Sequence, residues 1–195
     1  KNLRKKIIQT AYEAGSSSAH IGGALSSVEI VSTLFSEVMN FNKNNYKDQT
    51  RDRFILSKGH ACLVYYSALA EIGIISDKIL KTFEKSESQL LGHPVKNKDL
   101  GIDFSNGSLG MGLSLGIGVS LACRHKKIDN KIYVLLGDGE CNEGSVWEAA
   151  MCASHLNLSQ LTVIIDRNNF QQTGSNNEIM SLDNLKGKLI SFGWN

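Results

Sequence analysis

Two apolar runs in the last third of the chain predict neighbouring strands of a parallel sheet. Residues 131–136 and 161–165 are almost continuously apolar, which is typical of strands that are covered on both faces. The residues between them, 144–156, place apolar side chains at helical spacing. Strand, helix and strand in this order form a βαβ unit, whose crossover is expected to be right-handed.

The pattern in the amino-terminal part of the chain predicts helices. Apolar positions recur with helical period over residues 3–14. Residues 26–29, Ser-Ser-Val-Glu, have the spacing of a capping box, which would start a second helix. The apolar face of this second helix would consist of Val31, Leu34, Phe35 and Val38.

One more strand and two more helices are expected in the middle of the chain. Residues 54–56 form a short apolar run, which predicts a buried strand, and residues 61–72 predict a helix. Ser76 is a candidate N-cap for a short helix that reaches Phe83. Together with the βαβ unit, these elements predict an α/β fold in which helices flank a parallel sheet.

Glycine is unusually clustered in this chain. Its 18 glycines, set against the single proline Pro94, gather at residues 15–23, 101–118 and 137–144. The second cluster opens a predicted helix that still contains Gly116 and Gly118. Because each glycine costs a helix about 1 kcal/mol relative to alanine, we expect this helix to pack closely against the sheet or a partner subunit.

Composition excludes several classes of protein. Hydrophobic residues make up 42% and charged residues 21%, which is ordinary for a globular protein. The net charge of +2 and the lack of a dense basic block disfavour binding to nucleic acid or to anionic membranes. No apolar run approaches the roughly 20 residues that span a bilayer. Without a linker or an internal repeat, residues 1–195 are interpreted as one domain.

The cysteines and the start of the chain predict a location. The four cysteines, at positions 62, 123, 141 and 152, lack the Cys-x-x-Cys spacing of many zinc and redox sites. They are interpreted as buried free thiols, which favours a reducing compartment. The first residues are polar and do not resemble a signal peptide. A cytoplasmic location is therefore expected.

Polar residues follow both strands of the βαβ unit. Asp138 comes after the first strand and Asn168 after the second. Since the carboxyl ends of parallel strands meet at one edge of a sheet, where ligands bind in open α/β folds, these side chains are expected to lie close together. A carboxylate, an amide oxygen and a backbone carbonyl near Phe170 suit Mg²⁺, whose shell a diphosphate would complete. Gly137 and Gly139 would let a phosphate approach the backbone.

A Gly-Asp-Gly turn after one strand is common by itself, but its pairing with Asn-Asn after the next strand is specific. Residues 137–144 and 166–169 together resemble the fingerprint of thiamine diphosphate-binding proteins. The rest of the chain resembles the amino-terminal, diphosphate-binding half of a transketolase. Further motifs of that family occur in the family's order, at residues 18–23, 53–60, 92–94 and 107–110.

The resemblance implies roles for particular residues. Asp138, Asn168 and the Phe170 carbonyl would hold Mg²⁺, with Ca²⁺ or Mn²⁺ as substitutes. Glu143 and Glu148 match acidic positions at the family's dimer interface that couple two active sites, although acids early in a helix also favour its dipole. The residues implied to contact the cofactor are Gly107, Leu109, Gly137, Asp138, Gly139, Glu143, Asn168 and Phe170. The implied fold is the diphosphate-binding (PP-type) fold of these enzymes.

The five histidines separate into two groups. His125 and His155 lie near the carboxyl ends of predicted helices and are interpreted as structural or surface residues. His20, His60 and His93 lie beside glycines in loops, each within a motif of the family. They are expected to form a catalytic cluster that exchanges protons with the substrate.

The resemblance also implies a reaction and a partner. A transketolase moves a two-carbon ketol unit from a ketose phosphate to an aldose phosphate, as in the pentose phosphate interconversions. The family's activating glutamate lies in a pyrimidine-binding domain, and nothing in this chain matches that domain. The chain is therefore expected to be a split-transketolase subunit or a fragment, incomplete at its C-terminal end and inactive alone. A companion chain would complete the site in a homodimer or heterotetramer.

Three positions depart from the family's usual residues, and alternatives remain open. Lys58, Asn106 and Met111 stand where full-length members often have asparagine, threonine and glutamine. A transketolase-like enzyme of an unusual sugar pathway is one alternative. A deoxyxylulose-phosphate synthase or a 2-oxo-acid dehydrogenase subunit is another, and a non-catalytic domain that binds metal and diphosphate is a third.

Overall fold

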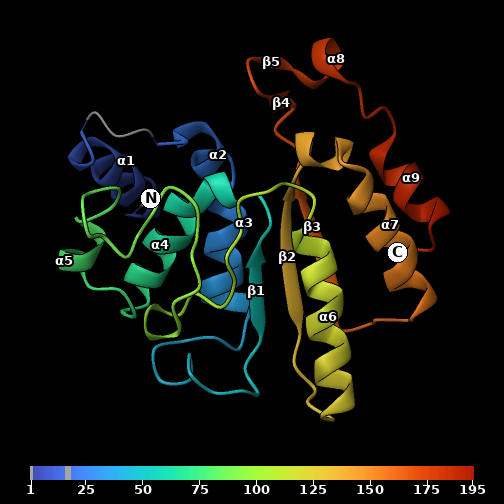
Figure 1. Cartoon of the computed structure of the whole chain (residues 1–195), viewed down its shortest axis with the longest axis horizontal. Helices are drawn as coiled ribbons and strands as arrows, with labels where there is room; N and C mark the ends of the chain where they lie inside the picture. The colour runs from blue at the N-terminus through green and yellow to red at the C-terminus, as the bar shows by residue number, and fades with distance from the viewer. Residues whose placement is uncertain (1, 16–18) are drawn as a thin grey trace.

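A parallel sheet runs through the middle of the computed structural model, which describes residues 2–15 and 19–195 (Figure 1). The strand order is β1-β2-β3, with β2 in the centre. Both pairs are parallel, and the register sets Leu56 beside Leu135 and Gly137 beside Asp166. These strands are β1 (Arg53–Leu56), β2 (Ile132–Gly137) and β3 (Leu161–Asp166). The predicted α/β fold and its βαβ unit are confirmed.

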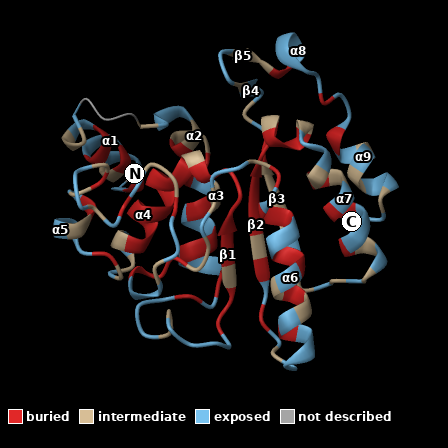
Figure 2. Ribbon diagram, in the orientation of Figure 1, coloured by how far each residue is buried: buried red, intermediate tan, exposed pale blue. Residues whose placement is uncertain are grey.

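Helices cover both faces of the sheet because successive side chains of each strand point to opposite faces. Phe54 and Leu56 belong to one hydrophobic core, and Ile55 between them belongs to the other. Figure 2 shows the strands buried between the two helical layers. The first layer contains α1 (Asn2–Glu13), α2 (Ile21–Ser26), α3 (Val28–Thr33) and α4 (Cys62–Glu71). The second contains α6 (Gly112–His125) and α7 (Gly144–His155).

Shorter elements connect these layers. A π-helical turn (Leu34–Val38) continues α3, and 3₁₀ turns cover Gly59–Ala61, Lys98–Leu100 and Gly139–Asn142. The helix α5 (Asp77–Leu80) is capped by the Ser76 side chain as predicted, but it stops before Phe83. After β3 come β4 (Phe170–Gln171), β5 (Gly174–Ser175), α8 (Asn176–Ile179) and α9 (Leu185–Ser191). In Figure 1, β4, β5 and α8 project beyond the carboxyl edge of the sheet.

The predicted capping box at residues 26–29 is wrong. Ser26 is the last residue of α2 rather than a cap, and Ser27 makes no side-chain capping bond to α3. Both hydroxyls instead donate to the Gly23 carbonyl and to the Asp166 carboxylate. The predicted cap therefore fails because both hydroxyls bond to Asp166, an acceptor far away in the sequence.

Two other predictions from apolar patterning fail at single positions. Val38 was expected on the buried face of its helix but is 47% exposed, because the π-helical turn rotates it away from the core. Cys152 was expected to be buried and is exposed on α7, whereas Cys62, Cys123 and Cys141 are buried free thiols. Over the described ranges, every helix is too short or too polar to cross a lipid bilayer.

Two of the glycines of α6, Gly116 and Gly118, have different surroundings. A Cβ built at Gly116 would lie 2.7 Å from Val134 Cγ2 and 3.0 Å from Leu161 Cδ1. This glycine therefore lets α6 pack closely on the sheet, as expected. Among residues 2–15 and 19–195, a Cβ at Gly118 would meet no atom within 4 Å, so packing within that part of the chain does not explain this glycine.

Candidate active site

The loops that follow β2 and β3 meet at the carboxyl edge of the sheet. Asp138 is only 1% exposed, although its side chain is polar. Its Oδ1 accepts a hydrogen bond from the Gly139 N–H at 2.9 Å, and its Oδ2 accepts one from the Asn169 N–H at 2.6 Å. The Asp138 side chain thus joins the two loops, whose proximity the strand order predicted.

The backbone conformation of the turn after β3 explains why the sequence has an Asn-Asn pair there. Asn169 has a φ of +64°, in the left-handed region that asparagine tolerates better than most residues. This conformation turns its N–H toward Asp138. Asn168 Oδ1 accepts a hydrogen bond from the Phe170 N–H at 2.8 Å, which tightens the same turn. The Phe170 side chain is 68% exposed, so only its backbone is part of this loop's framework.

The donor set at this edge fits a hard divalent cation that is shared with a phosphate ligand. Each Asp138 oxygen accepts one backbone hydrogen bond and so keeps lone-pair capacity. The described residues contain no group of three or more His, Cys, Asp or Glu side chains that could hold a metal. A cation here would depend on the Asn168 amide, on backbone carbonyls and on ligand oxygens, which is the coordination that Mg²⁺ favours.

A glycine loop, residues 107–110, lies beside this edge. Gly110 has a φ of +81°, and a Cβ there would lie 2.5 Å from Ser145 Oγ and 2.7 Å from Glu143 Cβ. Gly107 is exposed, and a Cβ built on it would meet, of the atoms that the structure describes, only His93 Cδ2, at 3.9 Å. Leu109 is half-buried. The loop is thus fixed at Gly110 and open at Gly107.

The three histidines in glycine-flanked loops lie together. The ring centroid of His20 is 5.6 Å from that of His60 and 5.7 Å from that of His93. They come from three places in the sequence: the start of α2, the turn after β1, and the loop before residues 107–110. The three rings therefore lie together as expected, and their catalytic role stays a prediction. His125 and His155 lie in the last turns of α6 and α7, also as expected.

Its surroundings keep His60 uncharged at neutral pH. Burial, assisted by the positive charge of Lys58 and by the neighbouring rings of His20 and His93, lowers the pKa of His60 to about 4. A neutral imidazole can accept a proton or a hydrogen bond from a substrate hydroxyl. The side chain also lies against Gly23, where a Cβ would be 2.7 Å from His60 Cδ2.

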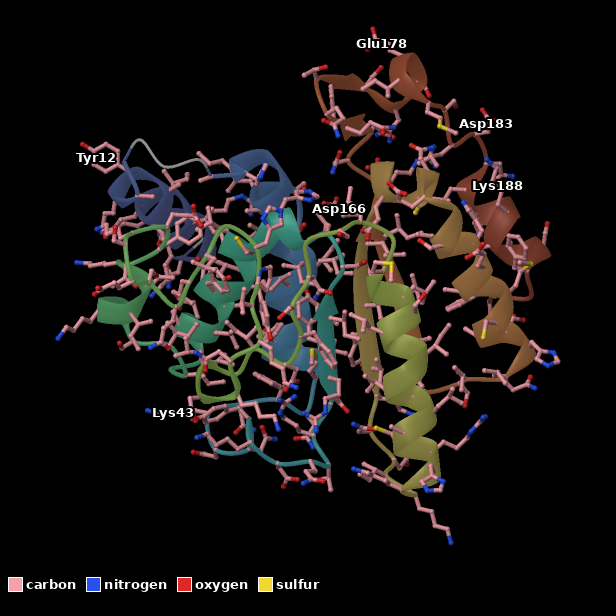
Figure 3. All side chains as sticks on the ribbon, viewed as in Figure 1. Tyr12, Lys43, Asp166, Glu178, Asp183 and Lys188 are labelled. Carbon is pink, nitrogen blue, oxygen red and sulfur yellow. The ribbon has the colours of Figure 1, made fainter. Side chains whose placement is uncertain are left out.

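A buried ion pair beneath the histidines was not predicted from the sequence. Lys58 Nζ lies 2.5 Å from Asp166 Oδ2, and their side chains are 1% and 7% exposed. Ser26 and Ser27 also donate to this oxygen, at 2.5 and 3.1 Å. Although burial opposes ionisation, these hydrogen bonds hold the pKa of Asp166 below its ordinary value. Figure 3 labels Asp166 at the carboxyl end of the sheet.

This network connects β3 to the elements that carry His20 and His60. Ser26 ends the helix that His20 begins, Lys58 precedes the turn of His60, and Asp166 ends β3. In the sequence, the signal for this ion pair was that Asp166 lies at the end of an apolar strand, just as Asp138 follows the preceding strand. Another residue without a predicted role, Glu140, is 2% exposed and lies in the turn directly after Asp138.

Glu143 and Glu148 lie on the outside of the chain. Glu143 is the N-cap residue of α7 without a side-chain capping bond, and Glu148 lies in its second turn. Both are exposed, so they are accessible to a partner. Their role at an interface stays a prediction, as does the contact of Glu143 with a cofactor.

Comparisons with known proteins agree with this geometry. A family model described as "Transketolase, thiamine diphosphate binding domain" matches residues 4–195. One subunit of the apulose-4-phosphate transketolase of Phocaeicola vulgatus is 40% identical over 191 residues, which cover 98% of this chain and 67% of that protein. One subunit of the 6-deoxy-6-sulfo-D-fructose transketolase of a Clostridium species is 38% identical over 175 residues, 90% of this chain and 64% of that protein.

A solved structure gives the same result for the fold. The transketolase of Leishmania mexicana superposes with a TM-score of 0.90 at 28% identity, covering 99% of this chain and 30% of that one. The chain thus spans about two thirds of the subunits it resembles and under a third of this longer enzyme. Its parallel sheet with flanking helices is the thiamine diphosphate-binding fold. The chain therefore belongs to the transketolase family, in which it corresponds to the amino-terminal, thiamine diphosphate-binding domain.

Proposed function

We propose that this chain, as one diphosphate-binding domain, holds the diphosphate end of thiamine diphosphate through Mg²⁺. We further propose that it acts with a companion chain to transfer two-carbon ketol units from a ketose phosphate to an aldose phosphate. The observation that carries the proposal is the buried Asp138 carboxylate, which joins the loops after β2 and β3. Asp138, Asn168 and the Phe170 carbonyl would hold the metal, with Ca²⁺ or Mn²⁺ as substitutes.

The cofactor-binding residues would divide between two loops. Gly137, Gly139 and their neighbours would bring backbone N–H groups to the diphosphate. Gly107 and Leu109 would border it from the other side, an assignment supported by the open backbone at Gly107. When bound, thiamine diphosphate would supply the carbon nucleophile and the electron sink for ketol transfer.

The histidines would handle the protons of the reaction. His60, which is neutral at physiological pH, would accept a proton from a donor hydroxyl. His20 and His93, whose ring centroids lie 5.7 Å apart, would share the donor and acceptor roles as the substrate oxygens change charge. The Lys58–Asp166 pair would keep the cluster in place from below.

A companion chain would carry the pyrimidine-binding domain and its glutamate. The Phocaeicola relative is named as one subunit of a transketolase, which supports this assembly. A shallow apolar groove on the outer side of α6 supports a docking place for the companion. Its volume is about 410 Å³. It is lined by Phe104, Met111, Ser114, Leu115, Gly118, Val119 and Ala122.

The position of this groove supports the same occupant. Met111 immediately follows the glycine loop at residues 107–110, so a chain docked in the groove would reach the cofactor. Gly118, where a Cβ would meet no atom of the described residues within 4 Å, would allow close approach of the companion's backbone. Glu143 and Glu148 would lie at the interface of a dimer of such pairs. Buried free thiols support a reducing, cytoplasmic location.

The first test removes the carboxylate that joins the loops. In Asp138→Ala, we expect Mg²⁺-dependent binding of thiamine diphosphate to fall at least a hundredfold, since the metal loses its charged ligand and the two loops lose their connection. Titration calorimetry with thiamine diphosphate in the presence and absence of Mg²⁺ measures this. Asp129→Ala is the matched control, because Asp129 is exposed and precedes β2 at the opposite end of the sheet.

The outcomes separate the alternatives. Unchanged binding in Asp138→Ala would refute the metal site. If the complex with the companion chain consumed pyruvate but no ketose phosphate, the chain would be part of a different thiamine diphosphate-dependent enzyme. Ketol transfer by this chain alone would refute the need for a companion.

A further inference from the structure

The Glu140 carboxylate lies where three hydrogen-bond donors converge. Its Oε1 accepts from Ser57 Oγ at 2.5 Å and from the Gly110 N–H at 2.8 Å, and its Oε2 accepts from the Gly137 N–H at 3.0 Å. Ser57 Oγ in turn accepts from the Gly112 N–H at 3.1 Å. Both side chains are almost completely buried, at 2% for Glu140 and 1% for Ser57.

These bonds connect elements that are far apart in the sequence. Ser57 follows β1, Gly137 ends β2, and Gly110 and Gly112 flank the start of α6. Gly137 directly precedes Asp138, the proposed metal ligand. One carboxylate therefore ties the strand end that carries the metal ligand to the loop, residues 107–110, that borders the cofactor.

The two peptide groups that flank Gly110 are each held by a hydrogen bond. The Gly110 N–H donates to Glu140, and its carbonyl accepts from Ser145 Oγ at 3.0 Å. Because Gly110 has a left-handed φ, it depends on these partners to fix its orientation. Residues 107–109, which precede it, are at least partly exposed and free to face a ligand.

The chemistry of the pocket requires a carboxylate. Every polar partner of Glu140 named above is a donor, and an ionised carboxylate is the side chain that accepts at both oxygens without donating. A glutamine would turn an NH₂ group toward one of these donors. Burial raises the pKa of Glu140, while the hydrogen bonds from Ser57, Gly110 and Gly137 and the charge of Lys58 oppose that shift.

We propose that Glu140 is a positioning residue of the cofactor site, which sets the glycine loop at residues 107–110 against the metal-binding end of β2. This proposal rests on the proposed binding of thiamine diphosphate. It assigns Glu140 no contact with the ligand. Glu140 instead holds the backbone groups that make the contact, so its effect is on affinity for the diphosphate.

Calorimetry of the full chain with thiamine diphosphate and Mg²⁺ tests the proposal. In Glu140→Gln, we expect the dissociation constant to rise about tenfold, because a buried donor loses its acceptor and the loop shifts. The binding stoichiometry should stay that of the wild type. A purely structural role would lower the stoichiometry by reducing the folded fraction, and would leave the dissociation constant unchanged.

Further variants complete the experiment. Ser57→Ala removes one donor of the same network and should raise the dissociation constant by a smaller factor. This variant tests the proposal if Glu140→Gln does not fold. The double variant should bind about as weakly as Glu140→Gln, because interacting residues are not additive. Glu37→Gln is the matched control, since Glu37 is exposed and lies outside the site.

The failures of the two proposals are distinguishable. If the wild-type chain bound no thiamine diphosphate in the presence of Mg²⁺, the proposed site would be wrong, and the role of Glu140 with it. If the wild type bound and both Glu140→Gln and Ser57→Ala bound equally well, only the positioning role would be overturned.

Discussion

At the scale of single residues, the charge state of His60 follows from the groups around it. The groups that act on the ring are Lys58, which follows β1, His20 at the start of α2, and His93 in the loop before residues 107–110. Asp166, at the end of β3, has a weaker and opposite electrostatic effect. The folded protein therefore binds a proton at His60 only near pH 4, whereas an unfolded chain binds it near the ordinary value of about 6.5.

The sign of the pH dependence follows. Between pH 6.5 and 4 the unfolded state binds a proton at His60 and the folded state does not. The contribution of His60 therefore lowers the free energy of unfolding as pH falls through that window. From pH 7.5 to 5 we expect a loss of roughly 1–2 kcal/mol from His60, after allowance for solvent screening. Urea denaturation of the wild type and of His60→Gln at the two pH values measures this loss. The free energy of unfolding should fall less in the variant than in the wild type, by the amount expected from His60.

His155→Gln is the control for this measurement, because His155 is exposed on the last turn of α7. NMR titration of the His60 ring gives the pKa directly. An ordinary titration near pH 6.5, or the same acid sensitivity in His60→Gln and wild type, would contradict the expectation.

The site residues differ in how far the sequence could predict them. Asp138 and Asn168 could be placed because parallel strands bring their carboxyl ends to one edge, a consequence of topology alone. Glu140 could not, because an acid after Gly-Asp-Gly equally suits an exposed first helical turn. Its burial depends on Ser57 and Gly110, which lie 83 and 30 residues away in sequence.

At the scale of elements, α6 shows how one helix uses its glycines on two faces. Gly116 faces β2 and β3, where its missing Cβ lets the helix approach Val134 and Leu161. Gly118 lies in the outer groove with Leu115 and Val119. The helix thus has one small residue where it packs on the sheet and another in the outer groove proposed for the companion chain.

Two alanine substitutions in α6 should have opposite effects. Gly116→Ala adds a Cβ that would contact Val134 at 2.7 Å, and we expect this overpacking to lower the free energy of unfolding by about 1–3 kcal/mol. Gly118→Ala meets no atom within 4 Å and should raise it by up to about 1 kcal/mol through helix propensity. Thermal or urea unfolding of the chain measures both. Equal effects of the two substitutions would contradict this account of α6.

The elements were predictable where the apolar pattern is clear and not where tertiary contacts compete. The strands are short, nearly continuous apolar runs, α1 and α7 place apolar residues at helical spacing, and α4 is apolar almost throughout, so these elements could be read from the sequence. The start of α6 was placed by the glycines at residues 107–112. The break between α2 and α3 at Ser27 could not, because it depends on Asp166, 139 residues later in the chain. The same long-range bond explains why the capping box does not form.

At the scale of the whole molecule, the outer groove of α6 should bind the companion chain. In Leu115→Asp, we expect the dissociation constant for a companion that carries the pyrimidine-binding domain to rise at least tenfold, because a charge would be buried where an apolar side chain of 36% exposure had been covered. Calorimetric titration of the companion into this chain measures it. Ile8→Asp is the matched control, since Ile8 is 54% exposed on α1, in the opposite layer.

Normal assembly of Leu115→Asp would exclude the groove as the docking place. If Ile8→Asp weakened assembly instead, the companion would bind the layer that contains α1. Neither result would alter the assignment of Asp138, whose test does not depend on the companion.

The central position of β2 has a consequence for how the chain folds. Leu135 pairs with Ile164, 29 positions later, but with Leu56, 79 positions earlier. Closing the shorter loop costs less entropy, so β2, α7 and β3 should associate first, and β1 should join them late. The three-histidine cluster and the Glu140 network both need β1, so they would form only in the last stage of folding. A refolding chain would therefore pass through a state with an assembled βαβ unit and an incomplete cofactor site.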